Sequence, residues 1–145
     1  MMKIEDIMAQ WEKDSVIDKT ELGDAALNIT KLHEKYLRIY TVEKLVYNKI
    51  SKEYKALWRD KYEFYTQGPS KETQEKGWVL PAKGKIIKQE IDIYMEADPD
   101  LTDMELKMEL IKTKLEYLES VLKIIHNMNY KVRAAIDWNK FVMGG

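Results

Sequence analysis

Cations and aromatic rings alternate between residues 54 and 65 of this chain. The cations are Lys55, Arg59 and Lys61, and the side chains among them are Tyr54, Leu57, Trp58, Tyr62, Phe64 and Tyr65. A single strand of nucleic acid is bound by such a combination, because cations contact phosphates while flat rings stack on unpaired bases. The pattern therefore predicts a site for single-stranded nucleic acid.

The same segment belongs to a long helical pattern, which leaves a second interpretation open. Mostly apolar side chains recur in a 4,3 alternation, the spacing of coiled coils. They are Leu22, Ala26, Ile29, His33, Tyr36, Tyr40, Glu43, Tyr47, Ile50, Tyr54, Leu57, Lys61 and Phe64. Trp58, Tyr62 and Tyr65 lie off this seam and are the better candidates for base stacking. Alternatively, the rings only pack and the cations only solvate the helix.

The first half of the chain is predicted to hold one short and one very long helix. Residues 3–13 place Ile4, Ile7, Met8 and Trp11 on one face of a short amphipathic helix. The long helix is predicted over residues 18–67, opened by a capping box of Asp18 and Glu21. Gly68 and Pro69 end it, since glycine and proline mark helix C-termini.

The second half is predicted to be a loop followed by a helix with two apolar lines. Residues 69–101 form an irregular connector, in which residues 85–97 include a short extended segment. Thr102 and Glu105 form a second capping box that opens a helix, with a stop or kink at residues 127–129 and a last amphipathic segment at 130–142. The apolar lines predict oligomerisation through Met104, Met108, Ile111, Leu115, Leu118, Val121, Leu122 and Ile125.

These elements predict a mainly α fold, a long antiparallel helical hairpin with coiled-coil-like helices. We expect a single domain over residues 1–145. Residues 1–68 would be a helical DNA-binding half, residues 69–101 a connector, and residues 102–145 a helical oligomerisation half.

Composition narrows the chemistry that the chain can perform. It has 145 residues, no cysteine and a net charge of −1, so disulfides and thiolate metal sites are excluded. Residues 31–61 carry nine cations against four carboxylates, and residues 98–119 carry seven carboxylates against three cations. The predicted molecule therefore has a basic half and an acidic patch.

Catalytic and cofactor motifs are not found. No glycine-rich phosphate loop is present. His33 and His126 have no partner at metal-ligand spacing. We therefore expect packing roles for both histidines, and we expect His33 to fix the register of the seam. The acidic residues 98–103 lack the glycine that a calcium loop needs. We predict no catalytic residue, no metal and no cofactor; a small enzyme remains an alternative only if Asp92, Glu96 and Asp98 surround a metal.

The N-terminal residues do not resemble a secretory signal, and no window approaches 18 consecutive apolar residues. The sequence therefore predicts a soluble, cytoplasmic protein without membrane contact.

Two segments resemble a known family. Residues 13–22 contain Asp14, Ile17, Asp18, Thr20 and Leu22 in an Asp-x-x-Ile-Asp-x-Thr-x-Leu pattern, and residues 61–68 follow the basic stretch with a pair of aromatic residues and a glycine. The chain is similar from end to end to the UvsY recombination mediator proteins of tailed phages, most specifically at residues 14–22.

This resemblance implies a non-enzymatic protein that acts in an infected bacterial host. It would form a ring-shaped homo-oligomer, a hexamer or heptamer, and bind single-stranded DNA through Arg59 and Lys61. It would help to load a RecA-like recombinase onto DNA covered by single-strand DNA-binding protein. The full predicted DNA site is Lys55, Trp58, Arg59, Lys61, Tyr62 and Tyr65. The alternative is a structural coiled-coil scaffold or adaptor with no nucleic-acid role.

Overall fold

The structure is a computed structural model that describes residues 2–144, and it confirms the predicted mainly α fold. The helices are α1 (Ile4–Asp14), α2 (Leu22–Gln67), α3 (Lys71–Glu75), α4 (Ile91–Ala97) and α5 (Pro99–Val142). Within the described residues there is no β-strand, and no helix is apolar over a length that could cross a membrane.

The chain divides into two compact units, to both of which α2 and α5 contribute. Unit 1 comprises the residues up to Leu45 and those from Lys112 onward, and unit 2 comprises Val46–Ile111. Pairs of contacting residues show that α2 and α5 are antiparallel in each unit. In unit 1 Tyr40 contacts Glu119 and Glu43 contacts Lys114, and in unit 2 Tyr54 contacts Glu105 and Lys61 contacts Asp100.

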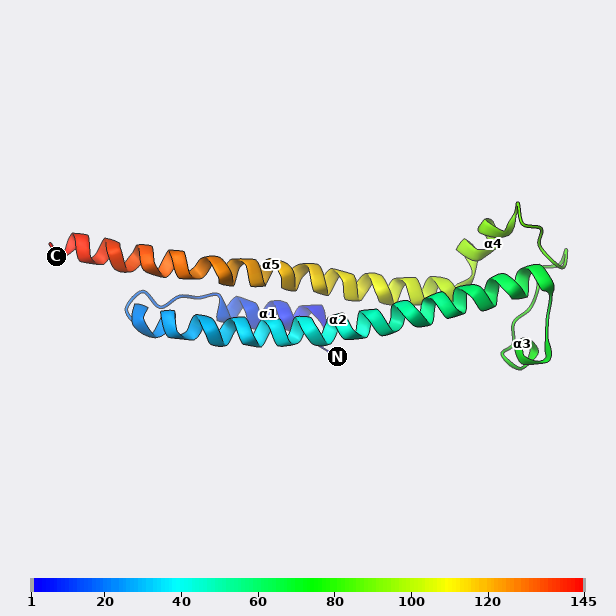
Figure 1. Ribbon diagram of the computed structural model, residues 1–145, viewed down its shortest axis with the longest axis horizontal. Coiled ribbons are helices and arrows are strands. Elements are labelled where there is room, and N and C mark those ends of the chain that lie inside the picture. The colour runs from blue at the N-terminus through cyan, green and yellow to red at the C-terminus, as the bar shows by residue number, and fades with distance from the viewer. Residues whose placement is uncertain (1, 145) are drawn as a thin grey trace. The chain divides into compact units, whose positions relative to one another are not determined.

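Unit 1 is a packing of α1, the first part of α2 and the last part of α5, which lie side by side (Figure 1). Its buried core consists of Ile7, Ile29, Leu32, Tyr36, Leu118, Val121, Ile125, Met128 and Val132. Leu32, not His33, occupies the seam, and His33 and His126 are both exposed. The predicted packing and register-fixing roles of the histidines were wrong, because the apolar neighbour of His33 is the side chain that is buried.

A buried ion pair crosses unit 1 from α2 to α5. Lys114 Nζ lies 2.9 Å from Glu43 Oε2, and both side chains are only 3% exposed. Lys114 Nζ also donates to the backbone oxygen of Met2 at 3.1 Å. Glu43, a charged residue of the predicted seam, is therefore paired with a residue of opposite charge on α5.

Unit 2 is built where α2 ends and α5 begins, around the connector between them. Its buried core consists of Phe64, Tyr65, Ile86, Ile91, Met95 and Leu101. α2 ends as predicted, with the Gly68 N–H donating to Phe64 O at 3.0 Å. Gly68 has φ +95°, a left-handed conformation that glycine adopts without a steric penalty.

The structure corrects both predicted helix starts. α2 begins at Leu22, because the Asp18 carboxylate accepts hydrogen bonds from the backbone and hydroxyl of Thr20 and so closes a turn ahead of the helix. α5 begins at Pro99, with Asp98 as its cap: Asp98 Oδ1 accepts from the backbone N–H groups of Asp100 and Leu101. A cap followed by proline is a strong helix start.

Two further predictions about local structure were also wrong. The extended segment predicted within residues 85–97 overlaps helix α4, which buries Ile91 and Met95 one turn apart. The stop predicted at residues 127–129 does not occur, since α5 continues to Val142. Met128 and Val132 are buried there, and this packing outweighs the weak helix propensity of the neighbouring asparagines.

Candidate nucleic-acid interface

The last turns of α2 in unit 2 have one buried face and one exposed cationic face. Lys52, Lys55 and Arg59 are exposed and follow one another at intervals of three and four residues, which places them along one side of a helix. Arg59 forms an ion pair with Asp60 at 3.5 Å, and its side chain remains 69% exposed. We name Lys52, Lys55 and Arg59 the basic stripe.

Two stacked rings lie beside the basic stripe. Trp58 and Tyr62 are stacked, with ring centroids 5.3 Å apart and planes 18° apart. Trp58 is 40% exposed and, with Tyr54 and Lys55, lines a depression of about 350 Å³. A base stacked on Trp58 in this depression would therefore lie near the Lys55 side chain.

Tyr54 is fixed in position at this depression. Its hydroxyl donates to Glu105 Oε1 on α5. Burial and this hydrogen bond raise the pKa of Tyr54 to about 12, so the hydroxyl remains a hydrogen-bond donor to Glu105.

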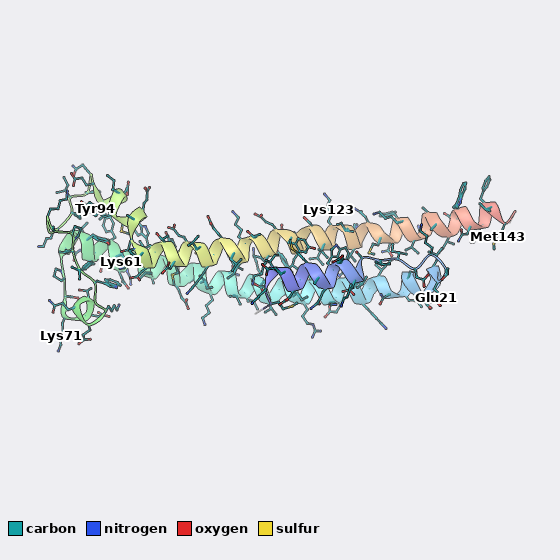
Figure 2. The ribbon with its side chains drawn as sticks, turned by 180° about the vertical axis from the view of Figure 1, so that it is seen from behind. Glu21, Lys61, Lys71, Tyr94, Lys123 and Met143 are labelled. Atoms are coloured by element: carbon teal, nitrogen blue, oxygen red, sulfur yellow. The ribbon has the colours of Figure 1, made fainter. Side chains whose placement is uncertain are left out.

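Lys61 is buried, whereas a side chain that contacts DNA must be exposed. Its Nζ lies 3.1 Å from Asp98 Oδ2 and 2.8 Å from Asp100 Oδ2, and 4.0 Å from the centre of the Trp78 ring. Its side chain is 5% exposed, at the end of α2 (Figure 2). The structure thus corrects its predicted role: Lys61 neutralises the buried cap of α5.

The structure also corrects the predicted DNA-binding role of Tyr65. Its hydroxyl donates to Asp98 Oδ2 at 2.6 Å, and its ring is buried in the unit 2 core. Burial alone would raise the pKa of Asp98, but the Tyr65 hydroxyl, the Leu101 N–H and the Lys61 ammonium together hold that pKa below its usual value. Tyr65, Lys61 and Asp98 therefore form one ionised, buried network.

The same network includes Asp98, one of the three residues, with Asp92 and Glu96, that would surround a metal if the protein were a small enzyme. The Asp98 carboxylate is buried and contacts Lys61 and Tyr65. Within residues 2–144, no group of three or more His, Asp or Glu side chains is placed to hold a metal ion.

The predicted oligomerisation residues are mostly used inside the monomer. Ile111, Leu115, Leu118, Val121 and Ile125 are buried, whereas Met104, Met108 and Leu122 are partly exposed. Large exposed apolar side chains on α5 lie elsewhere, at Leu106, Leu110, Ile124, Tyr130, Trp138, Phe141 and Val142. The buried five cannot contact another subunit while the monomer stays folded.

Sequence reasoning missed two residues of this region. Lys52 continues the cationic line of Lys55 and Arg59, and its spacing of three residues from Lys55 was a readable signal. Asp98 gave a weaker signal, the Asp-Pro dipeptide that often opens a helix.

Comparisons with known proteins agree with this architecture. Residues 10–145 match the family described as "Recombination, repair and ssDNA binding protein UvsY". No curated protein sequence matches the chain. The crystal structure of the recombination mediator protein UvsY from bacteriophage T4 in lattice type II superposes with a TM-score of 0.87 at 20% identity, covering 99% of each chain. The lattice type I structure gives a TM-score of 0.82 at 20% identity over 94% of this chain and 98% of the other.

Proposed function

This chain belongs to the UvsY family, and from that premise we propose that it is a recombination mediator that binds single-stranded DNA. The observation that carries the proposal is the pairing of exposed Trp58 and its stacked neighbour Tyr62 with the basic stripe. Rings and cations on adjacent faces of one helix are the two contacts that a single strand needs.

The basic stripe provides phosphate contacts along α2. Lys52 and Arg59 are seven positions apart, which is about 10 Å along a helix that rises 1.5 Å per residue. One strand of a duplex carries a phosphate about every 3.4 Å along the helix axis, so the stripe can face at most about three phosphates, and fewer on an extended single strand. Each contact releases counterions, and binding must weaken with salt.

Replacing Trp58 by alanine should weaken DNA binding while leaving the fold intact. Stacking is worth about 1–3 kcal/mol per base, so we expect the Kd for a labelled oligothymidylate to rise by about 5-fold to 150-fold. Fluorescence anisotropy at several salt concentrations measures this, with Trp58→Phe as the matched control that keeps a ring. Salt-independent binding, or no binding by the wild type at low salt, would favour the scaffold alternative instead.

We further propose that the protein works as a ring-shaped homo-oligomer, a hexamer or heptamer. Repeating a weak DNA contact around a ring raises its effective concentration. The surface that supports self-association is the end of α5, where Trp138 and Phe141 are stacked at 5.7 Å and Phe141 is 75% exposed. Exposed apolar clusters of this kind mark interaction sites.

Replacing Trp138 and Phe141 by aspartate should reduce the assembly to smaller species. The change adds charge to an exposed apolar surface, so helical content should stay the same while self-association is lost. Sedimentation equilibrium measures the mass, and circular dichroism checks the fold. Lys131→Asp with Lys140→Asp introduces the same side chains without removing rings and serves as the control. An unchanged mass for the Trp138 and Phe141 variant would place the interface elsewhere.

In this proposal the oligomer acts on DNA by binding, without bond chemistry. It would distort a strand that is covered by single-strand DNA-binding protein and so weaken the binding of that protein to the strand. It would then present the strand to a RecA-like recombinase in the cytoplasm of an infected bacterial host. The acidic residues on the exposed side of α5 would be available for these protein contacts.

A further inference from the structure

The connector between α3 and α4 carries a basic surface that neither the core nor the proposed DNA site uses. Residues 76–90 contain four lysines and one glutamate. Two of these lysines already have carboxylate partners, since Lys76 pairs with Glu72 and Lys83 with Glu90. The other two, Lys85 and Lys88, are exposed and have no carboxylate within ion-pair distance among residues 2–144.

Ile87 lies between these two lysines and is 59% exposed. Its neighbour Ile86 is buried, and the Ile86 N–H donates to Tyr65 O at 2.8 Å. The connector is therefore attached to the end of α2 at Ile86. Ile86 is buried, whereas its neighbours Lys85 and Ile87 and the following Lys88 are exposed to solvent.

The stem of Lys85 is held against the end of α2. A Cβ atom placed on Gly68 would lie 2.9 Å from Lys85 Cε. The absence of a side chain at Gly68 thus leaves the space that the Lys85 stem occupies. A cation whose stem is packed loses less conformational entropy when it binds a partner.

We propose that Lys85, Ile87 and Lys88 form a docking surface for an extended acidic peptide that carries a large apolar side chain. Two cations without partners give charge complementarity to carboxylates, and Ile87 gives an apolar contact between them. Such complementarity sets specificity and the rate of encounter. The occupant is a segment of another protein.

The side chains near this surface favour a peptide over nucleic acid. Bases need exposed ring faces for stacking, and Ile87 has none. The rings of the connector region are covered by cations: Lys61 lies 4.0 Å and Lys76 5.0 Å from the centre of the Trp78 ring, and Lys83 lies 5.6 Å from that of Tyr94.

The test measures binding of a fluorescein-labelled peptide of aspartates with one leucine and one phenylalanine at its centre, using the full-length protein. One control peptide carries asparagine in place of every aspartate, and a second carries serine in place of the two apolar residues. We expect the aspartate peptide with its two apolar residues to bind the wild type. Two variants, the double variant Lys85→Glu with Lys88→Glu and the single variant Ile87→Ser, should each weaken this binding by about tenfold or more. Lys49→Glu with Lys71→Glu is the charge-matched control and should change it by about twofold or less.

A labelled oligothymidylate, measured on the same variants, separates this proposal from the proposed DNA site. Arg59→Ala should lower affinity for the oligonucleotide and leave peptide binding intact, and the Lys85 and Lys88 variant should do the reverse. Equal binding of the asparagine peptide, no binding of the aspartate peptide, or loss of oligonucleotide binding in the Lys85 and Lys88 variant without loss of peptide binding would each overturn the docking proposal.

Discussion

Replacing Lys114 by methionine should lower the free energy of unfolding of unit 1 by about 3–5 kcal/mol, because it leaves Glu43 buried without its counter-charge. Glu43 is 3% exposed and has Lys114 Nζ at 2.9 Å. The substitution also removes the hydrogen bond from Lys114 to Met2 O. Urea denaturation followed by far-ultraviolet circular dichroism measures the loss.

Two control variants make this prediction specific. Lys112→Met, at an exposed position two residues earlier on the same helix, should change stability by no more than about 0.5 kcal/mol. Adding Glu43→Leu to Lys114→Met should restore most of the loss, since a buried pair replaced by apolar residues is often neutral or stabilising. Equal effects of Lys112→Met and Lys114→Met would show that the pair is not buried in solution.

Lys61→Met and Arg59→Ala should have opposite consequences although the two residues are neighbours on α2. Lys61→Met leaves Asp98 buried without its cation and should destabilise unit 2 by about 3–5 kcal/mol. Arg59→Ala should leave stability nearly unchanged. It should weaken oligothymidylate binding and reduce the slope of log K against log salt by about 0.7, the value for one phosphate contact on a single strand.

Melting curves and salt titrations on the same samples check this pair of outcomes. Lys55→Ala should behave like Arg59→Ala, since both remove an exposed cation of the basic stripe, and Lys71→Ala, at an exposed position outside the stripe, is the control that should leave the salt slope unchanged. If Lys61→Met lowered the salt slope and left the melting curve unchanged, Lys61 would be a direct DNA contact, as the family resemblance implied, and its burial between Asp98 and Asp100 would not describe the protein in solution.

Much of the fold was predictable because helix periodicity is a local property. The 4,3 alternation predicted the long helix α2, the capping box at Asp18 placed its start four residues too early, and Gly68 placed its end correctly. The predicted seam even included Glu43 and Lys61, the two buried charges of α2. The errors came where a competing interaction decided the outcome, as with the cap of Asp98 on α5 and the packing of Met128 across the predicted stop.

The candidate site was only partly predictable for the same reason. Spacing put Trp58, Tyr62 and Tyr65 off the seam, and the structure leaves Trp58 exposed and Tyr62 half-buried. Tyr65 differs because the connector contacts it: the Ile86 N–H donates to its backbone oxygen and Asp98 accepts from its hydroxyl. No helical pattern within α2 contains information about those partners.

The sequence by itself determined α1, α2 and most of α5, the apolar faces of these helices and the family, since these follow from spacing and from residue types within short windows. Only the tertiary structure decided which cations are available to a ligand. Arg59 and Lys61 are two residues apart and equally basic, but Asp98 and Asp100, more than thirty residues further along the chain, surround Lys61 alone. Burial and ion pairing depend on such distant partners, so the fold divides one basic segment into a structural cation and an exposed stripe.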